Sequence, residues 1–134
     1  MYATTTVTPR FFETDALGHI NNATLSTWFE EARRPIFKVF VPDLNPHNWN
    51  LILAHLEIDF LNQIYFSADV ELKTGILKLG NSSMVLDQEA WQNGKKVAAC
   101  KAVMVHFDYM TNASAPIPDD LREQLAQFMV GEEL

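Results

Sequence analysis

The sequence predicts an α+β fold in which a curved antiparallel sheet of five strands wraps around one long central helix. Two observations indicate this class. Apolar residues recur at helical spacing between residues 22 and 37, whereas four segments after residue 51 have the twofold alternation of strands. Tight-turn signals separate several of these later segments, which favours antiparallel neighbours over parallel strands with long crossovers.

The first strand is expected within residues 2–13, which are rich in Thr, Val and Phe. Pro9 favours an edge or a bulge there, because proline cannot donate to a ladder. Residues 15–22 are then expected to form a loop that closes on a helix start. Asn21 or Asn22 can cap that helix by accepting a hydrogen bond from a free backbone N–H.

The central helix is predicted from one apolar stripe. Its members are Leu25, Trp28, Phe29, Ala32, Ile36 and Phe37. Glu30, Arg33 and Arg34 are expected to face away, with Glu30 placed to pair with Arg34 across one turn. Pro35 is expected to kink the helix or to end its first part, because it removes a hydrogen bond and clashes with the preceding turn.

Four strands and a short helix are expected after a loop at residues 40–50. The alternating residues Ile52, Ala54, Leu56, Ile58 and Phe60 predict the apolar face of a half-buried strand. Further strands are expected at residues 68–73, 84–91 and 97–107, with tight turns at Gly80-Asn81 and Asn93-Gly94. Residues 116–118 open a short helix with Leu121, Leu125 and Phe128 on one side.

Composition narrows the class of protein. A length of 134 residues predicts a single domain over residues 1–134, and the net charge of −7 disfavours a nucleic-acid-binding protein. The acidic excess gathers at the ends, as at Glu132-Glu133. Cys100 is the single cysteine, so no intrachain disulfide is possible. We expect no signal peptide and no membrane span, and therefore a cytoplasmic address.

The segment at residues 11–22, Phe-Phe-Glu-Thr-Asp-Ala-Leu-Gly-His-Ile-Asn-Asn, carries the most specific pattern. It resembles the signature of hotdog-fold thioesterases of the 4-hydroxybenzoyl-CoA type, with Asp15, Gly18 and Asn22 at the family's spacings. Its His-Ile-Asn-Asn ending is similar to the related acyl-carrier-protein thioesterases, which usually have Asn where this chain has Leu17. Residues 28–33, 58–61, 80–83 and 116–118 resemble the family's later elements in the same order.

Thioester hydrolysis needs a group that attacks the carbonyl or activates water, and donors for the developing oxyanion. A carboxylate just before a helix suits the first task, so we predict Asp15 as nucleophile or general base. The helix N-terminus suits the second, and we predict the backbone N–H near Asn22 as the donor. Gly18 would allow the sharp turn between them. His19 would orient the carboxylate or bind the substrate carbonyl.

Each candidate residue can also be explained by a purely structural role. Asp15 and His19 can serve as turn residues and Asn22 as a helix cap, while Trp28 suits the core as well as a substrate pocket. Gly18, Ile20, Trp28, Ser82 and Ser83 are the expected substrate-binding residues, although hairpin polarity explains the two serines equally. Glu30 and Glu31 are rival catalytic carboxylates, against which their arginine neighbours favour an ion pair.

The resemblance implies a hotdog acyl-CoA thioesterase that forms a homodimer or homotetramer and needs no dissociable cofactor. The four histidines show no metal-ligand spacing, so no metal is expected. Two alternatives stay open. One is hydrolysis of thioesters on acyl carrier protein, and the other is a non-catalytic acyl-CoA-binding protein.

Overall fold

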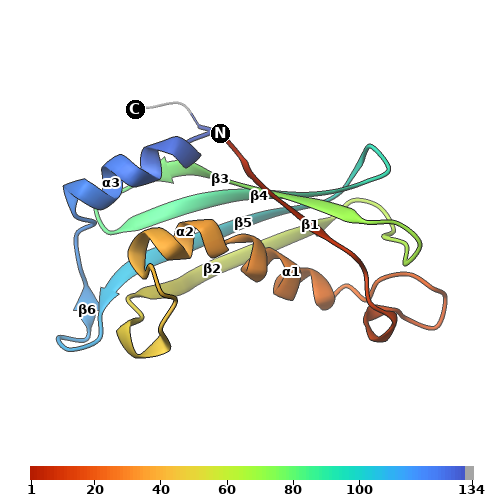
Figure 1. The fold of residues 1–134 in the computed structure, drawn as a ribbon, viewed down its shortest axis with the longest axis horizontal. Coiled ribbons are helices and arrows are strands. Elements are labelled where there is room, and N and C mark those ends of the chain that lie inside the picture. The colour runs from red at the N-terminus through yellow and green to blue at the C-terminus, as the bar shows by residue number, and fades with distance from the viewer. Residues whose placement is uncertain (132–134) are drawn as a thin grey trace.

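Five strands form one antiparallel sheet in the spatial order β1-β3-β4-β5-β2, and a sixth short strand pairs with the end of β5 (Figure 1). The computed structural model describes residues 1–131, so the predicted acidic end at Glu132-Glu133 lies outside the described residues. The strands are β1 (Ala3–Val7), β2 (Leu51–Phe60), β3 (Val70–Leu79), β4 (Ser83–Gln92), β5 (Lys95–Asp108) and β6 (Ala113–Ser114). The sheet curls around the helices, so the predicted α+β class is confirmed.

Two tight turns join the central strands as predicted. Asn93 and Gly94 both have positive φ, 53° and 74°, as the two-residue turn between β4 and β5 requires. The turn from β3 to β4 is closed by the Gly80 N–H, which donates to the Ser83 carbonyl at 2.7 Å. β6 was not predicted, because a two-residue strand has no periodicity to detect.

The first strand is shorter than predicted. β1 ends at Val7, and a 3₁₀ turn, η1, covers Phe11–Glu13. The reason lies in Pro9, which cannot donate to a ladder, and in Glu13, whose carboxylate draws the Arg10 N–H out of the strand direction.

A β-bulge in β2 corrects the predicted apolar face. Leu53 pairs with Met104 and His55 with Val103, so Ala54 is the extra residue. Inward-facing positions are therefore Leu51 and Leu53 before the bulge, and Leu56, Ile58 and Phe60 after it, because cross-strand partners share a face. The predictions for Ile52 and Ala54 were wrong, since the alternation changes phase at this point.

Two short helices replace the single long one. α1 (Thr24–Ala32) and α2 (Arg34–Phe40) meet at Arg33, and a third helix, α3 (Asp119–Leu125), lies near the end of β3 (Figure 1). Pro35 stands in the first turn of α2, where its missing N–H costs no hydrogen bond, so the predicted interruption is confirmed. Within residues 1–131, no helix has the length and apolar character needed to cross a bilayer.

The helices bury two apolar clusters against the sheet. α1 contributes Leu25, Trp28, Phe29 and Ala32 to one cluster, and α2 contributes Ile36, Val39 and Phe40 to the other. The predicted stripe is thus confirmed, except that Phe37 is only half-buried.

A polar cluster at the helix junction contradicts the prediction that Arg33 faces away. Arg33 is 2% exposed, and its Nη1 donates to Gln88 Oε1 at 3.0 Å. Gln88 Nε2 in turn donates to the Phe29 carbonyl and to Thr74 Oγ1, each at 2.9 Å. The helix break rotates Arg33 inward, where a buried amide replaces the water that an exposed arginine would bind.

This cluster predicts the cost of losing Gln88. We expect Gln88→Ala to lower the free energy of unfolding by about 3 kcal/mol, because the guanidinium then stays buried without its acceptor. The double variant Arg33→Met, Gln88→Leu should recover most of that loss. Urea denaturation at neutral pH measures both. Gln124→Ala, an exposed control, should stay within about 0.5 kcal/mol of wild type. A Gln88→Ala protein as stable as wild type would contradict this account.

Candidate active site

A short closed loop presents the predicted residues. Thr14 bridges Ile20, and the Asp15 N–H donates to the His19 carbonyl at 2.7 Å. The turn at its tip depends on Gly18, whose φ of +78° is strained for any residue with a Cβ. The predicted role of Gly18 in letting the loop turn sharply therefore agrees with its conformation.

The Asp15 carboxylate uses only one of its two oxygens inside the loop. Oδ1 accepts the N–H groups of Leu17 at 2.8 Å and His19 at 3.1 Å. Oδ2 has no hydrogen-bond partner among residues 1–131, and the side chain is exposed. The loop thus orients a carboxylate while leaving one oxygen free to act on a ligand.

The loop is anchored to residues 64–66. The Ile20 N–H donates to the Ile64 carbonyl at 2.7 Å, and the Phe66 N–H donates to the Gly18 carbonyl at 3.3 Å. The His19 ring packs edge-on against the Tyr65 ring, with centroids 5.2 Å apart. It is therefore the His19 backbone, and not its imidazole, that meets the Asp15 carboxylate.

The helix start differs from the predicted cap. α1 begins at Thr24, and its cap position, Ala23, makes no side-chain cap. Asn21 Oδ1 accepts the Ala23 N–H at 3.0 Å, so Asn21 forms a turn before the helix. Neither Asn21 nor Asn22 stands at the cap position, because the helix starts later than the sequence pattern indicated.

One amide at this turn is left free. The N–H groups of Ala23, Thr24 and Leu25 all donate to Asn21 or Asn22. Among the residues that the structure describes, the Asn22 N–H has no acceptor. It lies just before the positive end of α1, so it is a donor available to an oxygen of a ligand.

Glu13 supports the loop and was missed as a site residue. It is 5% exposed, and its carboxylate accepts the Arg10 N–H at 2.7 Å and Trp28 Nε1 at 2.9 Å. Burial alone would raise the pKa of Glu13, but these hydrogen bonds and the Arg10 charge hold it below its ordinary value. The spacing of Arg10 and Glu13, together with a tryptophan that needs an acceptor, was the available signal.

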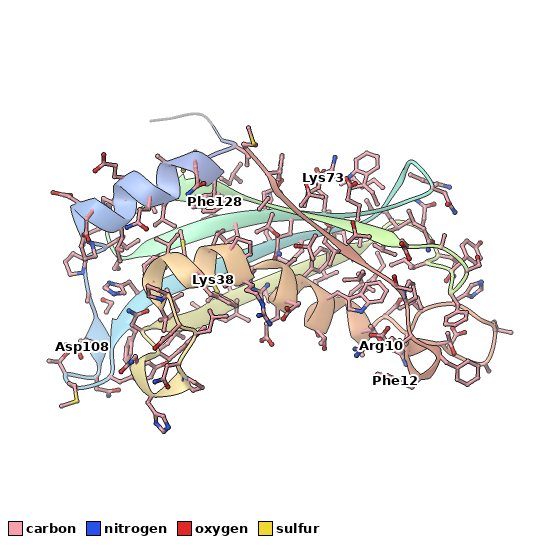
Figure 2. The ribbon with its side chains drawn as sticks, viewed as in Figure 1. Arg10, Phe12, Lys38, Lys73, Asp108 and Phe128 are labelled. Carbon is pink, nitrogen blue, oxygen red and sulfur yellow. The ribbon has the colours of Figure 1, made fainter. Side chains whose placement is uncertain are left out.

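Exposed apolar side chains surround the loop, and the sequence did not predict a role for them. Phe11, Phe12 and Leu17 are 81%, 75% and 78% exposed. Phe11 meets Phe66 edge-on at 6.2 Å, and the Arg10 guanidinium lies 4.7 Å from the centre of the Phe12 ring. Figure 2 shows Arg10 and Phe12 together at the end of the molecule opposite Asp108. A gathered apolar surface of this kind is typical of a binding site.

Four predicted substrate-binding residues do not line this loop surface in a single chain. Ile20 and Trp28 are each 4% exposed and belong to the core cluster under α1, so they support the loop from below. Ser82 and Ser83 lie at the β3–β4 turn, at the other end of the sheet (Figure 1). One chain therefore brings Asp15, Gly18 and His19 together in one loop, with Asn22 just after it, but not the serines.

The rival carboxylates on α1 have separate surroundings. Arg34 pairs with Glu31 at 2.8 Å, so the predicted pairing with Glu30 was wrong. Glu30 is exposed and forms no ion pair within residues 1–131. Both glutamates line an open hollow of about 440 Å³ between the helix junction and β2.

Other reactive groups are poorly placed for catalysis. Burial raises the pKa of Cys100 to about 11, so the thiol stays protonated and is a poor nucleophile. Within residues 1–131, no three His, Cys, Asp or Glu side chains lie close enough to share a metal ion.

Most of the chain matches a known protein family. The pattern of the thioesterase-like superfamily matches residues 9–125, which include the loop and most of the sheet. The chain belongs to this superfamily. Its fold is the hotdog fold, as the resemblance implied.

Individual relatives agree with this membership. The chain is 41% identical to a structure described as a predicted thioesterase from Bacillus stearothermophilus, with a TM-score of 0.95 over 99% of this chain and 100% of that one. It is 30% identical to a Thermus thermophilus thioesterase complexed with coenzyme A and Zn, with a TM-score of 0.82 over 91% of this chain and 95% of that one. The uncharacterized protein YsmA of Bacillus subtilis is 31% identical over 80 residues, which cover 60% of this chain and 54% of that protein. The match thus spans about half the length of the curated relative.

The low pKa of Glu13 predicts how stability responds to acid. At neutral pH, Glu13→Gln should lower the free energy of unfolding by about 2 kcal/mol, because a charged acceptor is lost. A lowered folded-state pKa contributes stability above the ordinary glutamate value of about 4.3, and that stability is lost as the pH falls through the folded value. The difference between wild type and variant should therefore shrink at acid pH.

Urea denaturation of both proteins at pH 7 and near pH 3 measures this difference. Glu123→Gln, at an exposed position, serves as the matched control and should change little at either pH. A difference between wild type and Glu13→Gln that stays constant across this range would contradict the assignment.

Proposed function

We propose that the protein is an acyl-CoA thioesterase in which Asp15 acts at the thioester carbonyl. The observation that carries this proposal is the Asp15 carboxylate, whose Oδ1 is held by two backbone amides while Oδ2 has no hydrogen-bond partner in the described part of the chain. Held in this way, the carboxylate needs little reorganisation before it reacts. The superfamily and the coenzyme A complex of the Thermus relative support a CoA thioester as the substrate.

Two routes from Asp15 give the same balanced hydrolysis. As a general base, Asp15 takes a proton from water while the water oxygen attacks the carbonyl carbon. As a nucleophile, it attacks the carbon itself and forms a mixed anhydride that water then opens. In both routes the carbon–sulfur bond breaks, and the thiolate leaves and takes up a proton. The free Asn22 N–H would donate to the carbonyl oxygen as negative charge develops there.

A homodimer or homotetramer belongs to this proposal. β2 is an edge strand of ten residues, in which Leu53 and Phe60 are 41% and 49% exposed, and Leu61, just after it, is 49% exposed. A long apolar edge strand readily pairs with another strand. If two copies paired antiparallel at β2, the Phe60 end of one would meet the Leu51 end of the other. Ser82 and Ser83 of the second copy would then approach the Asp15 loop of the first.

Two alternatives make different predictions on a defined panel of substrates. An acyl-carrier-protein thioesterase would turn over the carrier-bound acyl group faster than the same group on CoA. A non-catalytic binding protein would bind acyl-CoA without releasing thiol. The exposed apolar surface around the loop suits all three, so only the assay separates them.

Asp15→Asn tests the catalytic role. We expect a loss of kcat of roughly a hundredfold or more on acyl-CoAs, because that is what removing an acid–base group typically contributes. Asparagine keeps an oxygen that accepts the Leu17 and His19 N–H groups, so the loop should keep its shape. Thiol release from aliphatic and aromatic acyl-CoAs is the measurement.

Asp43→Asn is the matched control, since Asp43 also accepts a nearby backbone N–H, that of Asn45 at 3.0 Å, in the exposed loop before β2. It should leave turnover unchanged. Unchanged turnover in Asp15→Asn would move the chemistry elsewhere, with Glu30 or Glu31 next. Absence of turnover in wild type on every thioester would favour the binding protein.

Ala54→Lys tests the oligomer, because Ala54 is exposed on the edge strand β2 and has no partner on β5. Light scattering should give wild type a mass of two or four times 15.2 kDa. The variant should shift toward the monomer and lose turnover, because a lysine on this edge disfavours strand pairing. A monomeric wild type with full turnover would contradict a shared site.

A further inference from the structure

A polar hollow lies at the same end of the sheet as the Asp15 loop. Its volume is about 260 Å³, and its walls come from residues 62–65 and from the β4–β5 turn. Figure 1 shows the loop at residues 14–20, the segment before β3 and the β4–β5 turn gathered at this end. Tyr65 joins the two places directly, because it lines the hollow and its ring packs on His19.

Hydrogen bonds hold the walls of this hollow in position. Gln92 is 4% exposed, accepts the Tyr65 N–H at 2.9 Å and donates to the carbonyls of Tyr65 and Ala68 at 2.7 and 2.8 Å. Asn62 donates to the Lys96 carbonyl at 3.0 Å. These hydrogen bonds tie residues 62–68 to β4 and β5, so the hollow is preformed.

The chemistry of the lining is that of an anion site. Lys95 contributes an ammonium group, and Gln63 and Asn93 contribute side-chain amides that form no hydrogen bond within residues 1–131. Among residues 1–131, no carboxylate lines the hollow. Three other surface hollows each include at least two carboxylates, drawn from Glu13, Glu30, Glu31, Asp69 and Glu71.

The net charge of the protein gives weight to this difference between the hollow and the other three hollows. The protein has a net charge of −7, so its overall field repels an anionic ligand. Lys95 is exposed and forms no ion pair in the described part of the chain, whereas Lys73 and Lys96 are each close to a glutamate. The Lys95 charge is therefore available to a ligand.

We propose that this hollow binds the phosphate group of a 4′-phosphopantetheine arm, with Lys95 as its cationic contact and Gln63 and Asn93 as amide donors. The proposal rests on the proposed thioesterase function, because the arm would carry the thioester toward Asp15. Coenzyme A and acyl carrier protein share this phosphate. Lys95 would thus be a binding residue for either carrier.

Calorimetric binding tests the phosphate site without relying on turnover. Wild type should bind 4′-phosphopantetheine at least tenfold more tightly than pantetheine, which lacks the phosphate. Lys95→Ala should remove most of that difference, and Lys95→Arg should keep it, because arginine also binds phosphate. Equal affinity of wild type for the two ligands would overturn the proposal, as would a Lys95→Ala protein that keeps the tenfold preference.

Lys78→Ala is the matched control. Lys78 is exposed on β3 near the Ser82-Ser83 turn and has no ion pair among the described residues. It should leave the tenfold preference intact. Loss of the preference in this variant instead would place the phosphate at the β3–β4 turn and overturn the assignment to Lys95.

Two further measurements separate the proposed phosphate site from the proposed catalysis. The loss of affinity in Lys95→Ala for coenzyme A and for a phosphopantetheinylated carrier protein tells which carrier uses the site. Phosphate-dependent binding by a wild type that hydrolyses no thioester would support this site while rejecting the proposed catalysis.

Discussion

The buried carboxylate of Glu13 holds together the three segments on which the candidate site depends. Its side chain accepts hydrogen bonds from Arg10, just after β1, and from Trp28 on α1. Its backbone carbonyl accepts the Asn21 N–H, which closes the base of the loop that carries Asp15. A buried carboxylate is tolerable only when donors surround it, so the chain must keep these segments in register. The position of Asp15 relative to the start of α1 follows from this arrangement.

A second buried polar group sets how the helices cover the sheet. The break at Arg33 divides the apolar cover into two short helices, each with its own cluster, and Gln88 on the sheet accepts a hydrogen bond from Arg33 Nη1 at the break. Gln88 also accepts a contact from Cys100 Sγ at 3.7 Å. One sheet residue thus links α1, β3 and β5 through its side-chain contacts.

The sequence predicted the features that have a periodic or local signal. The apolar stripe of the helices, the Asn93-Gly94 turn and the interruption at Pro35 are of this kind. Features decided by tertiary contacts were missed or wrong. The alternation of residues 52–60 gives no sign of the bulge at Ala54. Arg33 would be exposed on an unbroken helix, and it is buried because the helix breaks at this residue. For the site, the resemblance to the hotdog thioesterases pointed to Asp15, Gly18 and Asn22. The support from Glu13 and the exposed phenylalanines around the loop are visible only in the folded chain.

The residues at the Asp15 loop fall into two groups, those on which the fold depends and those on which it does not. Phe11, Phe12 and Leu17 face outward, while the residues that hold the loop, Glu13 and Ile20, are buried beneath it. Replacing an outward side chain leaves the hydrogen bonds and the core untouched, so it costs little folding free energy. Natural variation can therefore remodel this loop surface freely and retain the carboxylate in place. The same division suits laboratory evolution, where libraries at these three positions would vary the surface beside Asp15 on an unchanged scaffold.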